Sequence, residues 1–295
     1  MNENSTIFQT KGIKELFVLS YRLYKENFLK FIGITLFLKG PYIIITYIIS
    51  KIISSSLTSI ITTNTENAIN LEYVSNIIIV ELLELAFIPF ISPIAISAIT
   101  VNISEKYLKK DIGIIDSYKR LTEKLLPLLG TILLSGILIS SGFIFALLLI
   151  MGNPQIANIM ILFAPAIASL FWVWYAFIPQ TVIIEGEGGI GAMKRSKYLT
   201  EGYFKRVFTL VVLVFIGILL ITWLCSFVFS KMLFFLGDNS AFLGKGLSNV
   251  VSVILEPFRM AIISLLYFEL RFRKEGFNLE TLEKELRSEI GLTYN

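Results

Sequence analysis

The chain has 295 residues, of which 55% are hydrophobic and only 16% are charged, and its mean hydropathy is +0.75. An average soluble domain has about 25% charged residues, so this deficit is typical of a protein whose surface mostly faces lipid. The formal charge of +4 is modest, and the basic residues flank apolar stretches, which indicates contact with anionic lipid head groups and not with nucleic acid.

Missing residue types narrow the chemistry further. There is no histidine, and the one cysteine, Cys225, lies inside an apolar run, so an internal disulfide and a zinc site of the usual His/Cys type are excluded. We therefore expect no metal and no cofactor. The first thirty residues lack the apolar core of a signal peptide, because basic residues interrupt them: Lys11, Lys14, Arg22, Lys25 and Lys30.

Apolar stretches of membrane-spanning length follow one another along the chain. A spanning helix needs about 20 mostly apolar residues. Six stretches reach that length: Phe31–Ser50, Ile77–Ile99, Leu126–Met151, Ile159–Ile184, Val207–Phe229 and Val250–Phe268. The whole chain, 1–295, is therefore predicted to be a single integral membrane domain, with a cytoplasmic amphipathic segment (1–30), six transmembrane helices (31–270) and a cytoplasmic C-terminal helix (271–295).

The distribution of basic residues predicts the topology. No lysine or arginine lies between Lys51 and Lys106, and cytoplasmic loops collect these residues whereas translocated loops lack them. With the N-terminus inside, the cytoplasmic segments hold 21 of the 26 basic residues, the opposite side holds 3, and 2 lie within spans. We predict an all-α, polytopic bundle of six transmembrane helices in three hairpins, in a bacterial plasma membrane, with both termini cytoplasmic.

Short amphipathic segments, which we call elbows, precede the odd-numbered spans. In the first elbow, apolar residues recur at helical spacing: Ile13, Leu16, Phe17, Tyr21, Tyr24 and Phe28. Such a helix either lies in the head-group layer or packs against the cytoplasmic end of the bundle, and both alternatives stay open. The residues expected to contact anionic lipid are Lys14, Arg22, Lys25, Lys119, Arg120, Lys194 and Arg195. In the C-terminal segment, a narrow stripe predicts a more soluble helix: Leu279, Leu282, Leu286 and Ile290.

Short sequence matches suggest an internal repeat. Leu121-Thr122-Glu123 recurs as Leu199-Thr200-Glu201, and Ala86-Phe87-Ile88-Pro89 recurs as Ala176-Phe177-Ile178-Pro179. Pro93 precedes Glu105 by the same distance as Pro257 precedes Glu269. The placement of these matches suggests three related units, each an elbow followed by a helical hairpin.

Five ionisable residues fall inside the predicted spans: Lys39, Glu81, Glu84, Glu256 and Arg259. A charge at bilayer depth is costly unless it is paired or hydrated. Glu256 and Arg259 are three residues apart and share one helix face, as do Glu81 and Glu84. We expect a buried polar cluster, which is either a polar path or head-group site between helices or a structural ion-pair network. Glu81 and Glu84 could instead reach the outer interface.

The sequence contains little that would indicate an enzyme. Gly186-Glu187-Gly188-Gly189-Ile190-Gly191 matches G-x-G-x-x-G literally, but the dinucleotide fingerprint needs a preceding strand, and here a membrane helix precedes it. We interpret it as a glycine-rich cytoplasmic turn. With no histidine base and no G-x-S-x-G motif, we predict no catalytic residues and a protein that is not an enzyme.

Two cytoplasmic stretches carry a family resemblance. They are Ala192-Met193-Lys194-Arg195-Ser196-Lys197-Tyr198-Leu199-Thr200-Glu201-Gly202 and the tail from Tyr267-Phe268-Glu269-Leu270-Arg271 through Arg273-Lys274-Glu275-Gly276 to Asn278-Leu279. Together they resemble the bacterial six-span membrane proteins related to the membrane domain of glycerophosphoryl diester phosphodiesterases. This chain has Glu269 and Asn278 where that family usually has aspartate. The resemblance implies a multi-pass bacterial membrane protein without the separate catalytic domain.

Two functions follow as expectations. The preferred one is a non-enzymatic multi-pass membrane protein that binds lipid or organises the cell envelope, with membrane lipids as its partners through their anionic head groups. The alternative is a transporter or permease subunit that uses the intramembrane charged cluster.

Overall fold

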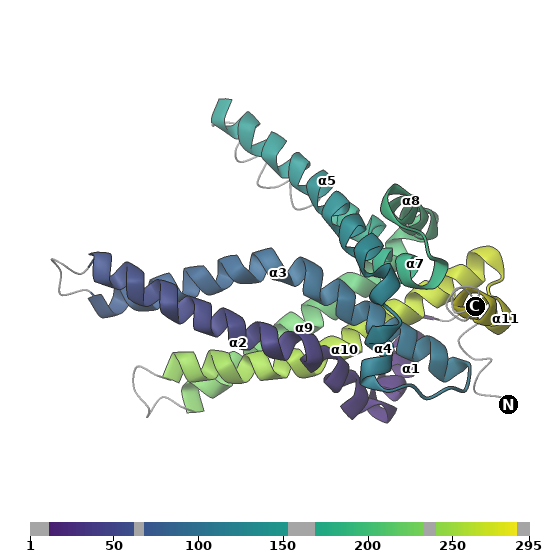
Figure 1. Ribbon diagram of the computed structural model, residues 1–295, viewed down its shortest axis with the longest axis horizontal. Coiled ribbons are helices and arrows are strands. Elements are labelled where there is room, and N and C mark those ends of the chain that lie inside the picture. The colour runs from purple at the N-terminus through teal and green to yellow at the C-terminus, as the bar shows by residue number, and fades with distance from the viewer. Residues whose placement is uncertain (1–11, 62–67, 153–168, 233–239, 288–295) are drawn as a thin grey trace.

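The computed structural model describes residues 12–61, 68–152, 169–232 and 240–287, and every regular element in these ranges is a helix (Figure 1). The elements in chain order are α1 (Ile13–Glu26), α2 (Phe28–Ile61), α3 (Ala68–Tyr107), α4 (Ile114–Lys119), a short 3-10 turn η2 (Thr122–Lys124), α5 (Leu125–Gly152), α7 (Ile178–Glu185), α8 (Gly189–Thr200), α9 (Phe204–Met232), α10 (Ser240–Glu275) and α11 (Leu279–Arg287).

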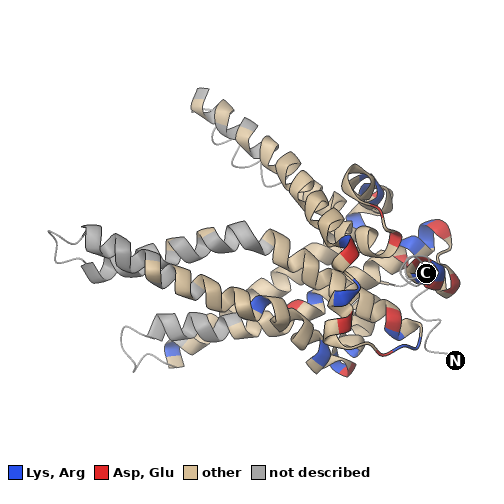
Figure 2. Cartoon of the chain, viewed as in Figure 1, with Lys and Arg blue, Asp and Glu red and all other residues tan. Residues whose placement is uncertain are grey.

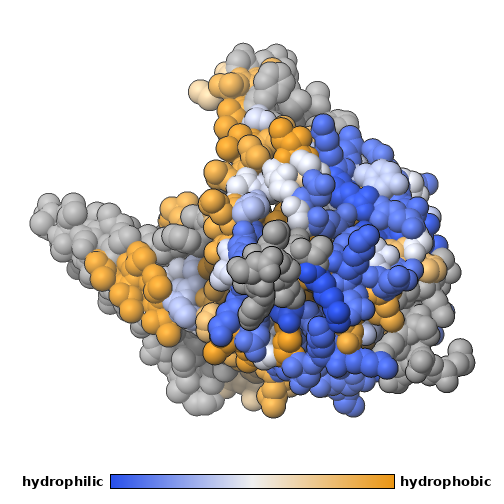
Figure 3. Space-filling view, turned by 45° about the vertical axis from the view of Figure 1, so that its right-hand side comes forward, coloured by the Kyte–Doolittle hydropathy of each residue, from blue (hydrophilic) through white to orange (hydrophobic). Residues whose placement is uncertain are grey.

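Long and short helices occupy different parts of the molecule. The short helices α1, α4, α7, α8 and α11 gather at one end, whereas the paired helices α2–α3 and α9–α10 extend away from that end, and α5 diverges from both pairs (Figure 1). The charged residues concentrate at the end with the short helices (Figure 2). In an oblique view with that end turned forward, hydrophilic and hydrophobic surfaces lie side by side (Figure 3).

Four helical stretches among the described residues are long and apolar enough to cross a membrane: Phe28–Thr46, Ile114–Ser141, Phe204–Phe229 and Val250–Glu275. The last is the central one, because 61% of its most apolar part is buried, against 22% or less for the other three. The predicted spans Ile77–Ile99 and Ile159–Ile184 include side chains outside the described residues. The chain is thus an all-helical protein with several potential membrane helices.

The hydrophobic core lies at the short-helix end and is built around α10. Residues 260–271 of α10 are all buried, and side chains from α1, α3, α9 and α11 pack on them. On α1, the Tyr24 ring meets Phe258 at 5.9 Å between centroids, and its hydroxyl donates to the carbonyl oxygen of Ile254 at 2.8 Å. Burial of these apolar side chains is the main force that holds the elbow to the bundle.

The predicted continuous helix Ile159–Ile184 is wrong in its last third. Residues 169–174 are helical, 175–177 form a turn, and α7 then begins at Ile178. Pro179 occupies the first turn of α7, where its missing N–H costs nothing, whereas a continuous helix would need that N–H to donate to the carbonyl oxygen of Tyr175. Residues 159–168 lie outside the described residues.

The predicted C-terminal helix 271–295 is also corrected. Helix α10 continues to Glu275 and stops at Gly276, whose φ of +64° is a left-handed conformation that favours glycine. After this break, α11 packs back on the core through Leu282 and Leu286, both buried. Ile290, the last residue of the predicted stripe, lies outside the described residues.

Helices α3 and α10 run parallel and in register. Ser92 Oγ donates to Glu256 Oε1 at 3.2 Å, and the hydroxyls of Thr100 and Ser264 lie 2.8 Å apart; both pairs are separated by 164 residues. A constant difference in residue number requires parallel helices, since in an antiparallel pair the sum would be constant. The same separation relates two further pairs of identical residues: Pro93 with Pro257 and Glu105 with Glu269.

Candidate functional site

The first elbow, α1, presents two different faces. Gly12 precedes the helix, and its N–H donates to Glu15 Oε2 at 2.9 Å, which caps the first turn. Asn27 ends it, because both its backbone N–H and its side chain donate to the carbonyl oxygen of Leu23. The inner part of the predicted apolar stripe, including Leu16 and Tyr24, packs on the core.

The outer face of α1 mixes apolar and basic side chains. Val18 is 52% exposed and Tyr21 is 59% exposed. The basic residues of this face, Lys14, Arg22 and Lys25, are exposed too, and the ion pairs found among the described residues do not include them. An exposed large apolar side chain next to cations suits the boundary between head groups and acyl chains.

The same spacing occurs on the other two elbows. An exposed apolar side chain is followed four positions later by an exposed basic one in α4 (Ile115 and Lys119) and in α8 (Ile190 and Lys194). On α1 the equivalent pairs are Val18 with Arg22 and Tyr21 with Lys25. Residues four apart lie on one face of a helix. The recurrence on three separate helices is what marks these surfaces as one candidate functional site, which we call the elbow faces.

Two residues predicted to contact lipid face inward instead. Arg120 pairs with Glu105, a residue of α3 whose side chain is 2% exposed. Arg195 Nε donates to Glu185 Oε2 at 2.5 Å, and its Nη2 donates to Glu275 Oε2 at 2.7 Å. Helical spacing in the sequence predicts which side of its own helix an arginine occupies. It does not predict which carboxylate of another helix faces that side. These two guanidinium groups therefore serve internal ion pairs.

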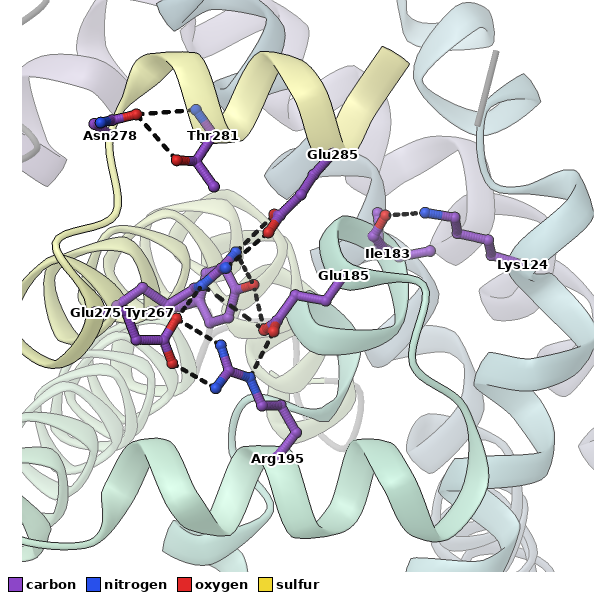
Figure 4. Close-up of polar contacts among 10 residues, drawn as sticks. Lys124, Ile183, Glu185, Arg195, Tyr267, Glu275, Asn278, Thr281 and Glu285 are labelled. Atoms are coloured by element: carbon purple, nitrogen blue, oxygen red, sulfur yellow. Dashed lines mark hydrogen bonds and ion pairs between the residues drawn. The ribbon is translucent and has the colours of Figure 1, made fainter. Parts of the chain in front are cut away.

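A network of ion pairs surrounds the end of α10 (Figure 4). The Arg271 guanidinium, buried in α10, binds Glu285 of α11 through two hydrogen bonds of 2.7 and 2.8 Å. Tyr267 donates its hydroxyl proton to Glu185 Oε1 at 2.8 Å. Together with Arg195 and Glu275, this joins α7, α8, α10 and α11.

Burial raises the pKa of the Glu185 carboxyl above its ordinary value, and Arg271 and Arg195 oppose that rise. The net direction is upward because removing the carboxylate from water costs more than its interactions with the two guanidinium groups and the Tyr267 hydroxyl gain. Sequence reasoning did not select Glu185 or Arg271 as site residues. The sequence offered one signal for them: Glu185 follows one apolar stretch in an acidic segment, and Arg271 follows another in a basic segment.

Inside the predicted spans, three of the five ionisable residues meet. Glu256, which is buried, pairs with Lys39 of α2 and with Arg259 Nη2, the latter at 3.2 Å. Ser92 of α3 completes the group, since Arg259 Nη2 donates to Ser92 Oγ at 3.0 Å and Ser92 donates to Glu256. Sequence reasoning missed Ser92, because a single serine in an apolar helix carries no distinctive signal.

Glu81 and Glu84 are not part of this described cluster. Their side chains lie outside the described residues, and along α3 they come eleven and eight residues before Ser92. A rise of about 1.5 Å per residue places the backbone of Glu84 roughly 12 Å from the level of Ser92. Among the residues that the structure describes, no group of three or more acidic or cysteine side chains gathers as a metal site requires.

The comparisons with known proteins give one match. A family model described as "Domain of unknown function (DUF7847)" matches residues 120–270, from just after α4 to the buried part of α10. Comparisons with curated proteins and with solved structures each found no match. Because the model covers half of the chain, which includes the inward-facing Arg120 and Arg195 and the central helix, the chain belongs to the DUF7847 family, a family of unknown function.

Proposed function

We propose that this protein is a non-enzymatic membrane component that binds anionic lipid at the cytoplasmic head-group layer through its three elbow faces. The observation that carries the proposal is the repeated pairing of an exposed apolar side chain with a basic one four residues later on α1, α4 and α8. Each pairing gives a helix both an apolar side for the acyl boundary and a cation for phosphate.

The arrangement in the membrane belongs to the same proposal. Six spans in three hairpins, with both termini on the cytoplasmic side of a plasma membrane, would place all three elbows at one interface. Two features support this topology. First, α1 and α8 directly precede a long apolar helix, and α4 does so with only the short turn η2 between. Second, the charged residues gather at one end of the molecule (Figure 2). An excess of basic residues is typical of the cytoplasmic side.

A binding experiment tests the lipid proposal. The triple variant Lys14→Gln, Arg22→Gln and Lys25→Gln is reconstituted in mixed phosphatidylcholine and phosphatidylglycerol vesicles, and the phosphatidylglycerol retained on the purified protein is measured against the wild type. Each basic residue near an anionic surface contributes about 1 kcal/mol, so the preference for phosphatidylglycerol should largely disappear. Lys284→Gln, an exposed change on α11 away from the elbow faces, is the control. An unchanged preference in the triple variant contradicts the proposal.

A transporter or permease subunit is the second candidate. It is favoured by the cluster of Lys39, Ser92, Glu256 and Arg259, where three helices bring opposite charges together inside predicted spans. Small-molecule flux into proteoliposomes separates the candidates: flux that Glu256→Gln abolishes supports transport, and the absence of flux together with anionic-lipid binding supports the first function.

A further inference from the structure

An open cleft of about 680 Å³ lies beside the first elbow, between the α1–α2 corner and the end of α3. One wall is the corner itself, residues 25–30, and the other is formed by Lys106, Lys109, Lys110 and Asp111. Two ion pairs bridge the walls: Lys106 Nζ to Glu26 Oε2 at 3.0 Å, and Lys30 to Asp111. These bridges hold the α1–α2 corner against the end of α3.

The cleft is strongly basic. Five lysines line it against two carboxylates, and each carboxylate is already engaged by one lysine in a bridge between the walls. The remaining three are Lys25, Lys109 and Lys110, for which the described residues provide no ion pair. Three ammonium groups around one cleft repel each other, and a bound anion would relieve that repulsion.

Lys109 stands at a position where glycine would be expected. Its φ of +60° is a left-handed conformation, and the N–H of Lys110 reaches back to the carbonyl oxygen of Glu105 at 2.8 Å, as at a helix end of the Schellman type. Glycine adopts this conformation more easily than lysine. A change to glycine therefore removes a charge from the cleft without disturbing the backbone there.

Two apolar side chains also line the cleft. Leu29 is 82% exposed and Phe28 is 39% exposed, and both line the cleft beside the lysines. An exposed leucine next to three cations matches an amphiphile, whose phosphate and acyl chain lie side by side, better than it matches a free phosphate ion.

We propose that this cleft is a specific site for the phosphate-bearing head group of an anionic phospholipid, with Lys25, Lys109 and Lys110 as the cations and Leu29 against the acyl chain. The proposal rests on the proposed function and deepens it, since it adds a saturable site to the general contact of the elbow faces with an anionic surface.

Two double variants of the full chain, which remove equal charge, test the site. The cleft variant is Lys109→Gly with Lys110→Gln, and the elbow variant is Lys14→Gln with Arg22→Gln, two exposed α1 residues outside the cleft. Purified proteins in neutral detergent are titrated with dioctanoyl phosphatidic acid, with dioctanoyl phosphatidylcholine and with inorganic phosphate. Because each basic residue contributes a factor of about five, the cleft variant should bind phosphatidic acid about 25-fold more weakly, at an unchanged or higher Tm. The elbow variant should keep the saturable site within about threefold.

The other outcomes each overturn the cleft site. Equal weakening in both variants shows surface attraction only and leaves the proposed function standing. Unchanged binding of phosphatidic acid in both variants shows that the cleft is not the binding site. If the elbow triple variant also keeps its preference for phosphatidylglycerol in vesicles, the proposed function fails as well. Equal affinity for phosphatidylcholine excludes recognition of the anion. Inorganic phosphate that binds as tightly as phosphatidic acid identifies a free-anion site and contradicts a lipid ligand.

Discussion

At the scale of single residues, Ser196 holds the break before α7 in place. Its hydroxyl donates to the carbonyl oxygen of Trp174 at 2.7 Å and accepts from the N–H of Phe177 at 3.1 Å. Both backbone groups lie at the turn 175–177, where the helical pattern is interrupted. A buried backbone group without a partner is costly, so one side chain of α8 makes the turn possible.

We predict that Ser196→Ala destabilises the protein by about 1–3 kcal/mol, because it leaves a buried donor and a buried acceptor unsatisfied. Thermal unfolding in detergent, followed by circular dichroism, measures the change. Ser140→Ala, at an exposed position on α5, is the matched control and should leave the unfolding curve unchanged. Equal stability of the Ser196 variant and the wild type would show that the hydroxyl is dispensable.

The raised pKa of the buried Glu185 carboxyl leads to a pH prediction. A raised pKa means that the folded state binds the proton of Glu185 more tightly than the unfolded state does. The protonated Glu185 carboxyl therefore contributes to the free energy of unfolding at pH values below its ordinary pKa of 4.5, and this contribution is lost as the pH rises through the pKa of the folded state. Glu185→Gln mimics the uncharged carboxyl at every pH. We expect this variant to match the wild type below about pH 4.5 and to have an equal or higher Tm at pH 7.

Arg271→Gln provides the contrast for that experiment. It removes the bidentate partner of Glu285 and leaves three carboxylates with one guanidinium group. Breaking a buried ion pair from one side costs about 3–5 kcal/mol, so its Tm should fall at neutral pH. A fall of the same size in Glu185→Gln would mean that attraction to the arginines outweighs the burial of the third carboxylate.

At the scale of the helices, the parallel register of α3 and α10 is a geometric claim that cross-linking can check. In a Cys225→Ser background, Thr100→Cys with Ser264→Cys should form a disulfide readily, because the two hydroxyl oxygens lie 2.8 Å apart. Ser104→Cys with Ser264→Cys, displaced by one turn along α3, should not. Mass spectrometry of the oxidised proteins measures both. Equal cross-linking of the two pairs would contradict the register.

Much of the helical layout could be predicted from the sequence, because long apolar stretches and amphipathic periodicity are local properties. The helices α2, α5 and α9, and the elbows before them, follow from such patterns. The break at 175–177 could not be placed in advance, because a proline in an apolar run is compatible with either a kink or an end. Ser196 decides this break from another helix.

The partners of the charged residues were harder to predict from the sequence. Lys39, Glu256 and Arg259 could be selected because charge is rare in apolar helices, but their partner Ser92 depends on the packing of α3 against α10. Likewise, Arg120 and Lys119 are neighbours in sequence, yet one binds buried Glu105 and the other is exposed. Which of two adjacent cations faces inward depends on a residue from another helix.

At the scale of the whole molecule, the charged end is the common location of the elbows and the basic cleft. The charged residues concentrate with the short helices, and the long apolar helices extend away from them (Figures 1 and 2). If this end meets the cytoplasmic head groups, then Val18, Ile115 and Ile190 should lie at one depth, because they are the exposed apolar residues of the three elbows.

Spin-label depth measurements test this claim most directly. In a Cys225→Ser background, single nitroxide labels are placed at Val18, Ile115 and Ile190, with Ile216 on α9 as the membrane reference and Glu280 on α11 as the aqueous reference. In anionic bilayers, we expect all three elbow labels to be relaxed by oxygen more than by a water-soluble nickel complex, at a depth between those of the two references. Elbow labels as accessible to nickel as the label at Glu280 would contradict the account.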